Sequence, residues 1–330
     1  MLFDGCGGDG KRINEPVERV SLQEMRAQCG FSPVHYKGMI EETCLKKESI
    51  SEKRKVYKKY LSIAAAFVIS GLLLYFGYTS LEEETVRQPY RIVALGDSII
   101  GKERDGSCVQ ARLEEYTGCS VLSGAFGGNL ASRGEHADSF SWHEESLNLY
   151  AVAEAVCQRD FGVQKADLAA SQTKAWYFED VLEGLEGADL SRTDILLLEF
   201  GVNDYMAGKA LDNPEDPLDV NTYGGALRYS IELFEKNYPD LEIVLVTPAF
   251  CHVVDHGFCT EADFGGGTLE KYVEQEKKVA AQYGLRVIDV FYEFGMDETN
   301  VMDLTEDGMH LSPEGRKDYA HFLAEKLGLI

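Results

Sequence analysis

The chain has 330 residues, of which 45% are hydrophobic and 27% charged, and it has no low-complexity tract. This composition predicts a folded protein with a sizeable core and excludes a mainly disordered or a collagen-like chain. The formal net charge of -24 argues against a nucleic-acid partner, because binding to phosphates relies on clustered Lys and Arg.

The charge is spread unevenly along the chain. Residues 1–80 hold 12 Lys and Arg against 9 Asp and Glu, whereas residues 81–330 hold 20 against 47. Residues 60–81 are 22 residues without a charge. At about 1.5 Å per residue, a helix of this length crosses a bilayer core of about 30 Å. We therefore expect a single transmembrane helix, with a buried core helix or a signal peptide as weaker alternatives.

The flanks of this run predict its orientation. Seven Lys and Arg precede it between residues 46 and 59, and Glu82, Glu83 and Glu84 follow it. The positive-inside rule then places residues 1–59 in the cytosol, as a partly helical tail with no identifiable protein partner. Residues 82–89 form a linker, and residues 90–330 form an extracytoplasmic domain on a cell membrane.

Strand and helix patterns alternate through the outer domain. Short apolar runs predict five strands, at residues 91–95, 120–122, 194–200, 242–247 and 286–290. Helical patterns lie between them, at residues 109–116, 147–159, 175–185, 223–237, 269–283 and 313–327. This alternation predicts a parallel sheet covered by helices on both faces, with a ligand site beyond the carboxyl ends of the strands.

Chemically useful side chains follow these strand ends. Ser98 comes directly after the first strand in the sequence GDS, where a nucleophile can point into the crevice, although Asp and Ser are also ordinary turn and helix-cap residues. A glycine-rich loop with Gly124, Gly127 and Gly128 follows the second strand and can aim backbone amides at an oxyanion. Asn203 follows the third strand in GVND and can donate its side-chain amide.

The last motif is DGMHLSPEG. Asp307 lies three residues before His310, so its carboxylate can hold the imidazole while the other ring nitrogen faces a nucleophile. Ser312 and Pro313 predict that a helix begins directly afterwards, as N-cap and first helical residue.

These four motifs together, in this order, resemble the SGNH or GDSL hydrolase family over residues 90–330. The resemblance implies a flavodoxin-like three-layer α/β/α sandwich with a five-stranded parallel sheet. It implies Ser98 as nucleophile with Asp307 and His310 as acid and base, and an oxyanion hole of Ser98, Gly128 and Asn203. Gly124 and Gly127 remain alternatives to Gly128. It implies no metal and no other cofactor.

Two further segments carry suggestive residues. The loop after the fourth strand holds Cys251, His252, Asp255, His256 and Cys259. We interpret it as a loop at the rim of the substrate site, with a metal site or a Cys251–Cys259 disulfide as alternatives. The long segment 129–191 holds aromatic residues and histidines that either stack on a sugar or belong to the core. These are His136, Trp142, His143, Trp176, Tyr177 and Phe178.

The sequence thus predicts a membrane-anchored extracytoplasmic serine esterase acting on acylated carbohydrate, envelope glycan or lipid. Acetyl transfer to a sugar and a non-catalytic envelope-binding or sensing module are the alternatives. The acidic outer domain favours neutral over anionic esters.

Overall fold

A computed structural model describes residues 89–134, 145–172 and 174–330, together with positions 54, 55, 58, 59, 61, 68 and 69. Residues 87–330 belong to one compact unit. Most of the predicted membrane span, tail and linker lies outside the described residues. Among the described residues, no helix is both long and apolar enough to cross a membrane.

Five parallel strands form the central sheet, in the order β2–β1–β3–β4–β7. All five predicted strands are confirmed, with ends shifted by one or two residues. Their bounds are Ile92–Gly96 for β1, Val121–Ser123 for β2, Ile195–Glu199 for β3, Glu242–Val246 for β4 and Arg286–Ile288 for β7. This strand order is that of flavodoxin-like folds, whose ligand site lies between the first and third strands, where the order reverses.

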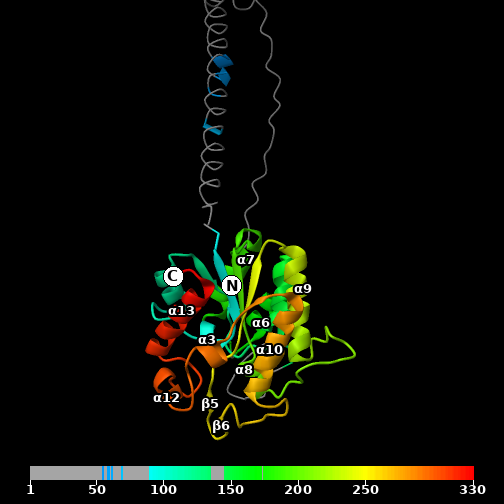
Figure 1. Cartoon of the computed structure of the whole chain (residues 1–330). Coiled ribbons are helices and arrows are strands. Elements are labelled where there is room, and N and C mark those ends of the chain that lie inside the picture. Colours follow the sequence, from blue (N-terminus) through cyan, green and yellow to red (C-terminus); the bar gives the residue numbers. More distant parts are fainter. Residues whose placement is uncertain are drawn as a thin grey trace, which may run out of the picture. The chain divides into compact units, whose positions relative to one another are not determined.

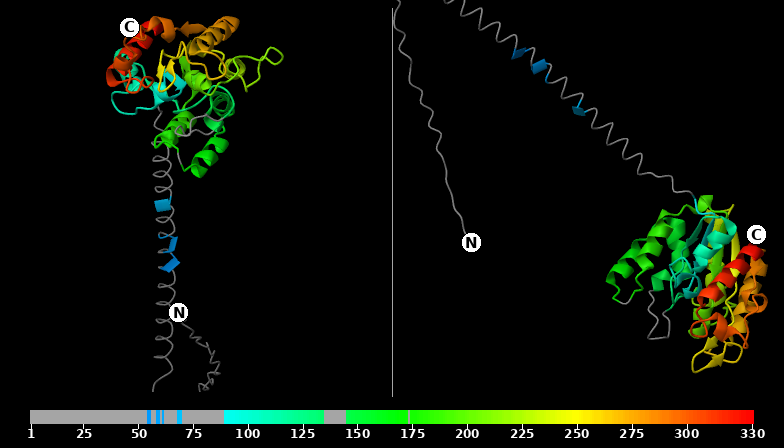
Figure 2. Two further views of the ribbon diagram at one scale, coloured as in Figure 1. Left: turned by 90° about the horizontal axis from the view of Figure 1, so that it is seen from below. Right: turned by 90° about the vertical axis from the view of Figure 1, so that its left-hand side faces the viewer.

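Helices flank the sheet on both sides, as Figures 1 and 2 show. On one side α4 (Val109–Thr117) packs against α13 (Pro313–Leu327). On the other, α9 (Tyr223–Asn237) lies between α5 (Leu149–Gln158) and α10 (Leu269–Tyr283). These helices confirm the sequence patterns, and α13 begins as predicted with Ser312 as N-cap and Pro313 in the first turn.

Shorter elements complete the unit. The segment between β2 and β3 holds η1 (Glu145–Leu147), α6 (Gly162–Ala170), α7 (Phe178–Gly187) and η2 (Leu190–Arg192). Elsewhere lie α3 (Ser98–Gly101), α8 (Val202–Met206), β5 (His252–Val253), β6 (Gly257–Phe258), α11 (Val290–Glu293) and α12 (Val301–Leu304). The sequence patterns did not predict α6 or the β5–β6 hairpin.

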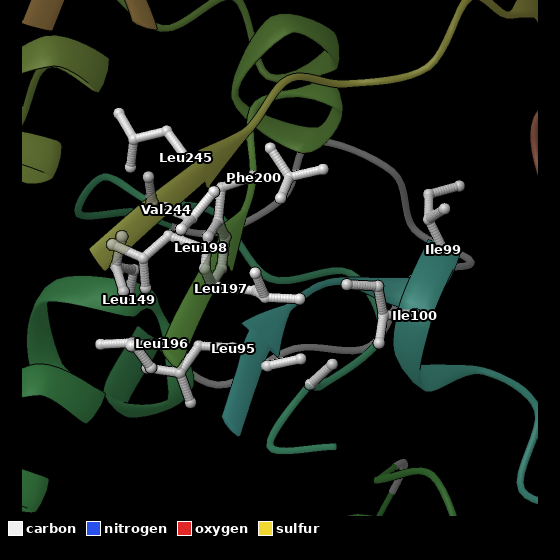
Figure 3. Close-up of a cluster of buried hydrophobic side chains, with 14 of the residues drawn as sticks. Leu95, Ile99, Ile100, Leu149, Leu196, Leu197, Leu198, Phe200, Val244 and Leu245 are labelled. Carbon is white, nitrogen blue, oxygen red and sulfur yellow. The ribbon is translucent and has the colours of Figure 1, made fainter. Parts of the chain in front are cut away.

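The core is centred on β3, whose residues are all buried. Leu198 pairs with Leu95 of β1 and with Leu245 of β4, so that leucines line up across three neighbouring strands. Figure 3 shows these side chains packed together with Phe200 and Leu149 of α5. A strand covered on both faces needs apolar residues at successive positions, which explains the run ILLL.

The middle of the sheet sets the position of the candidate site. In the register of β1 and β3, Gly96 is the partner of Glu199, so both strands end at the same level. Ser98 and Asn203, which follow these strands, are thereby brought to one edge of the sheet.

Arg228 of α9 ties this helix to the loop that precedes it. Its side chain is only 6% exposed and donates to both carboxylate oxygens of Asp212, at 2.8 and 2.9 Å. It also donates to Gln282 in α10, at 2.7 Å. The hydrogen bonds from Arg228 lower the pKa of Asp212 to about 2.

We expect Arg228→Leu to lower the free energy of unfolding by about 3 kcal/mol at neutral pH, because Asp212 loses its partner. Since the pKa of Asp212 is lowered on folding, this contribution is present above the pKa of an unfolded Asp, about 3.9, and is lost as the pH falls toward 2. Urea unfolding at neutral pH and at a pH of about 2 measures this contribution to the free energy of unfolding. Lys278→Ala is the control: its contact with Asp212 is 3.7 Å long and its side chain 61% exposed, so it should cost less than about 1 kcal/mol. Equal losses in both variants would contradict the assignment.

Candidate active site

Ser98 is the first residue of α3 and lies directly beyond β1. Asp97, fully buried, is the N-cap of this short helix, and its Oδ1 accepts a hydrogen bond from Ile99 N at 2.9 Å. The helix-cap and the nucleophile interpretations of GDS are therefore compatible, since the aspartate caps a helix and the serine lies on the first turn of this helix.

His310 lies beside Ser98, although 212 positions separate them in the sequence. Its Nε2 is 3.0 Å from Ser98 Oγ, and its Nδ1 is 2.7 Å from Asp307 Oδ2. The other oxygen of Asp307 accepts hydrogen bonds from the backbone amides of Met309, at 3.1 Å, and His310, at 2.8 Å. Both hydrogen bonds predicted for the histidine ring are present.

Asp307 is set up to remain ionised. Partial burial favours its neutral form, but the hydrogen bonds from the side chain and backbone of His310 outweigh burial, and the pKa of Asp307 falls well below its usual range. A carboxylate in this state can stabilise a positive charge on the imidazole.

The loop that carries Asp307 and His310 is held at both ends. Thr305 and Leu311 form a β-bridge across it, and Thr305 Oγ1 accepts a hydrogen bond from Gly308 N at 3.0 Å. Gly308 has φ of 92° and packs directly against the backbone of His252, so a side chain would clash there. The loop therefore depends on glycine at this position.

The three candidate glycines of the loop after β2 differ in whether their backbone amides have partners among the described residues. The amide of Gly124 donates to Ala94 O at 2.8 Å, and that of Gly127 donates to the hydroxyl of Tyr177 at 3.1 Å. Neither the amide of Gly128, whose φ is 82°, nor that of Ser98 donates to any described residue. Of the three candidate glycines, Gly128 is thus the one with an amide available to a ligand.

Asn203 in α8 is buried next to Asp97, the residue that precedes Ser98. Its Nδ2 donates to Asp97 Oδ2 at 3.1 Å and to the carbonyl oxygen of Asn129 at 3.0 Å. Both hydrogens of the amide are therefore occupied, an arrangement that the motif alone did not indicate. A ligand oxygen must share one of these hydrogens or displace one of these acceptors.

Sequence reasoning considered Asp97 only as a turn or helix-cap residue and missed Glu199, although both carboxyl groups are fully buried where β1 and β3 end. The signal was present, because Glu199 interrupts an otherwise apolar strand and buried carboxyl groups are rare unless paired. It also missed Asp204, whose carboxylate accepts hydrogen bonds from the amides of Ala131 and Ser132, at 2.7 and 3.0 Å. Asp204 thereby anchors the end of the glycine-rich loop.

The aromatic residues between β2 and β3 divide into two kinds. Tyr177 and Phe178 are buried, whereas Trp176 is 77% exposed. The ring of Tyr177 contacts the guanidinium of Arg104, 5.1 Å from the ring centroid, and its hydroxyl accepts a hydrogen bond from Gly127, which lies beside Ser98. His136, Trp142 and His143 lie outside the described residues.

The loop after β4 forms the β5–β6 hairpin and adjoins the loop of Asp307 and His310, since His252 N donates to Gly308 O at 2.8 Å. Cys251 and Cys259 are buried free thiols at its base, with Cys251 N 3.2 Å from Cys259 Sγ. Among the described residues, no three His, Cys, Asp or Glu side chains are grouped as metal ligands. The hairpin supports the histidine loop through its backbone.

Comparison with solved structures agrees with the fold. A protein from Lactobacillus plantarum is 16% identical, with a TM-score of 0.50 over 73% of this chain and 97% of its own. A possible lipase from Chitinophaga pinensis is 16% identical, with a TM-score of 0.47 over 72% and 99%. Est24, a carbohydrate acetylesterase from Sinorhizobium meliloti, is 14% identical, with a TM-score of 0.41 over 72% and 97%. No curated protein matches the chain.

The family comparison is more specific. The model of the GDSL-like lipase/acylhydrolase family matches residues 94–317, which include Ser98, Asn203, Asp307 and His310. This range covers most of the described unit and more than half of the chain. The chain belongs to the GDSL-like lipase/acylhydrolase family and is a carboxylic ester hydrolase.

Proposed function

We propose that this protein is a serine esterase that cleaves carboxylic esters through a Ser98–His310–Asp307 triad. One observation carries the proposal: the unbroken series of hydrogen bonds from Ser98 Oγ through the His310 ring to a carboxylate kept in its ionised form. A serine hydroxyl is a weak nucleophile, and a base at this position activates it.

The reaction has two halves. His310 Nε2 takes the proton of Ser98 as Oγ attacks the ester carbonyl, and the protonated imidazole then gives this proton to the departing alcohol. An acyl-serine remains. Water attacks it with His310 again as base, and the carboxylic acid leaves as Ser98 regains its proton. Asp307 stabilises the imidazolium in both halves.

The oxyanion of each tetrahedral intermediate would be held by the amides of Ser98 and Gly128 and by the side chain of Asn203. Losing one such donor commonly costs about 2.7 to 4 kcal/mol of transition-state stabilisation. Asn203 is held in place by Asp97 and Asn129, so the oxyanion would share one of the amide hydrogens that these two contacts occupy.

We further propose that residues 60–81 anchor the enzyme in a membrane, with the esterase domain outside the cell. The substrates would then be acylated carbohydrates, envelope glycans or lipids. The charge-free run and its basic upstream flank support this assignment.

The decisive experiment uses Ser98→Ala. A fluorophosphonate probe and hydrolysis of an aryl acetate should both report the wild-type enzyme, and both signals should fall at least 10³-fold in the variant, because the nucleophile is absent. Cys108→Ala is the control. It should keep both signals, because Cys108 belongs to neither the proposed triad nor the proposed oxyanion hole. If Ser98→Ala is labelled as well as the wild type, another nucleophile is at work. A neutral sugar added as acceptor distinguishes hydrolysis from acyl transfer by its acetylated product.

The membrane topology has its own test. Protease added to intact cells should remove the domain that follows Tyr90 and leave a membrane-bound fragment that contains the tail, because residues 82–89 would be exposed outside. Lysed cells serve as the control for susceptibility. Protection in intact cells together with cleavage after lysis would reverse the orientation.

The charge of the outer segment predicts substrate preference. Residues 81–330 hold 20 basic and 47 acidic residues, so an anionic ester should react more slowly than a neutral one of the same shape at low salt. The difference should shrink as the screening length falls to about 10 Å at ~0.1 M salt. Values of kcat/KM across a salt series measure this. A preference for the anionic ester that weakens with salt would instead indicate local attraction by Arg104, which lies over Tyr177.

A further inference from the structure

Two carboxyl groups lie side by side beneath the nucleophile turn, both fully buried. Asp97 follows β1 and Glu199 ends β3, and the partner of Glu199 in the sheet is Gly96. A Cβ at Gly96 would lie 3.1 Å from Glu199 Oε2, so glycine leaves room for the glutamate to reach the aspartate. The two carboxyl groups are close enough for each to shift the pKa of the other.

Their surroundings differ. Asp97 accepts hydrogen bonds from Ile99 N at 2.9 Å and from Asn203 Nδ2 at 3.1 Å. Neither oxygen of Glu199 has a hydrogen-bond partner at normal geometry among the described residues, and only the backbone amide of Asp97 favours its ionised form. Two adjacent buried carboxylates cannot both be ionised, because neither is solvated and their charges repel. The charge therefore belongs on Asp97, which has the donors, and the proton on Glu199.

The other groups near the pair do not change this assignment. Glu276 of α10 is also buried, which raises its pKa well above its usual range, and it accepts a hydrogen bond from Tyr223 of α9 at 2.9 Å. Tyr319 of α13 brings a buried hydroxyl without a partner among the described residues. His310 and Asp204 act on Asp97 from further away, in opposite directions.

Burial shifts the pKa values of both Asp97 and Glu199 upward. Burial raises the pKa of Asp97, whereas the hydrogen bond from Ile99 N lowers it and favours the ionised form. Burial also raises the pKa of Glu199 well above its usual range, and the negative charges of Asp97 and Glu276 add to the effect.

We propose that Glu199 is a positioning residue, kept as a carboxylic acid whose O–H donates to the carboxylate of Asp97. This hydrogen bond gives Asp97 a third donor and holds its other contacts in place. Asp97 in turn orients the amide of Asn203 and the first turn of α3, on which Ser98 lies. The role in positioning Asn203 rests on the proposed esterase function, whereas the shared proton does not.

The proton is tested through Glu199→Gln, in which an amide N–H replaces the acid O–H. If the folded protein holds a proton on Glu199 that the unfolded chain releases, the unfolding equilibrium constant of the wild type should rise about tenfold per pH unit relative to the variant. The window lies above the pKa of an unfolded Glu, about 4.3, and below the pH at which the pair ionises. Urea unfolding from about pH 5.5 to about pH 7 measures the difference. Parallel pH dependences would overturn the proposal.

Infrared spectroscopy provides a second, independent readout. The wild type at neutral pH should show a carboxylic acid C=O band that Glu199→Gln lacks. Glu276→Gln separates the contribution of the neighbouring buried carboxyl group. A carboxylic acid C=O band that is unchanged in Glu199→Gln would show that Glu199 is ionised and would overturn the proposal.

The positioning role is tested by kinetics. Glu199→Met removes the donor at similar size and should lower kcat by about 10- to 100-fold with little change in KM, since a misplaced oxyanion donor acts on the transition state. Glu199→Gln should restore most of this loss, and Glu276→Gln should keep wild-type kcat. Circular dichroism confirms folding. Equal losses in Glu199→Gln and Glu199→Met would overturn the role, whereas activity surviving in Ser98→Ala would overturn only the esterase mechanism.

Discussion

The parallel pairing of β1 with β3 is the constraint on which the rest of the site depends. It sets Gly96 opposite Glu199 and ends both strands at one level. Ser98 then begins one helix and Asn203 lies in another at the same sheet edge, close enough for Asn203 to bond to Asp97 at 3.1 Å. Ser98 and the candidate oxyanion donor are therefore positioned by two strands whose residues are all buried.

Around this rigid centre, the remaining functional groups are held by loops. His310 reaches Ser98 from the loop before α13, which a β-bridge closes and the β5–β6 hairpin supports. Gly128 lies in a loop whose end is anchored by Asp204. Loops on a rigid scaffold are where catalytic residues commonly lie, because their backbone polar groups stay available.

The buried carboxyl groups near the candidate site lower the stability of the fold, but they also position groups of the site. Burying carboxyl groups is unfavourable unless they are neutral or paired, and Asp97, Glu199 and Glu276 all lie inside the core. Hydrogen bonds compensate for Asp97 and partly for Glu276, whereas Glu199 has only Asp97. Buried ionisable groups with shifted pKa values cluster at functional sites. This is the reason to test Glu199 for an effect on activity as well as on stability.

The sequence by itself determined the five strands and the six main helices, and it predicted Ser98, Asp307 and His310 as the candidate catalytic residues, since their motifs follow strand ends or precede a helix cap. Local periodicity and capping depend on neighbours in the chain, so they can be read from it. The sequence could not decide which glycine amide is free, because Gly124 and Gly127 are occupied by groups from β1 and from Tyr177, 50 positions away. Nor could it show that Asp97 meets both Asn203 and Glu199. Those contacts exist only once β1 and β3 pair, because the proximity of distant side chains is a property of the tertiary structure.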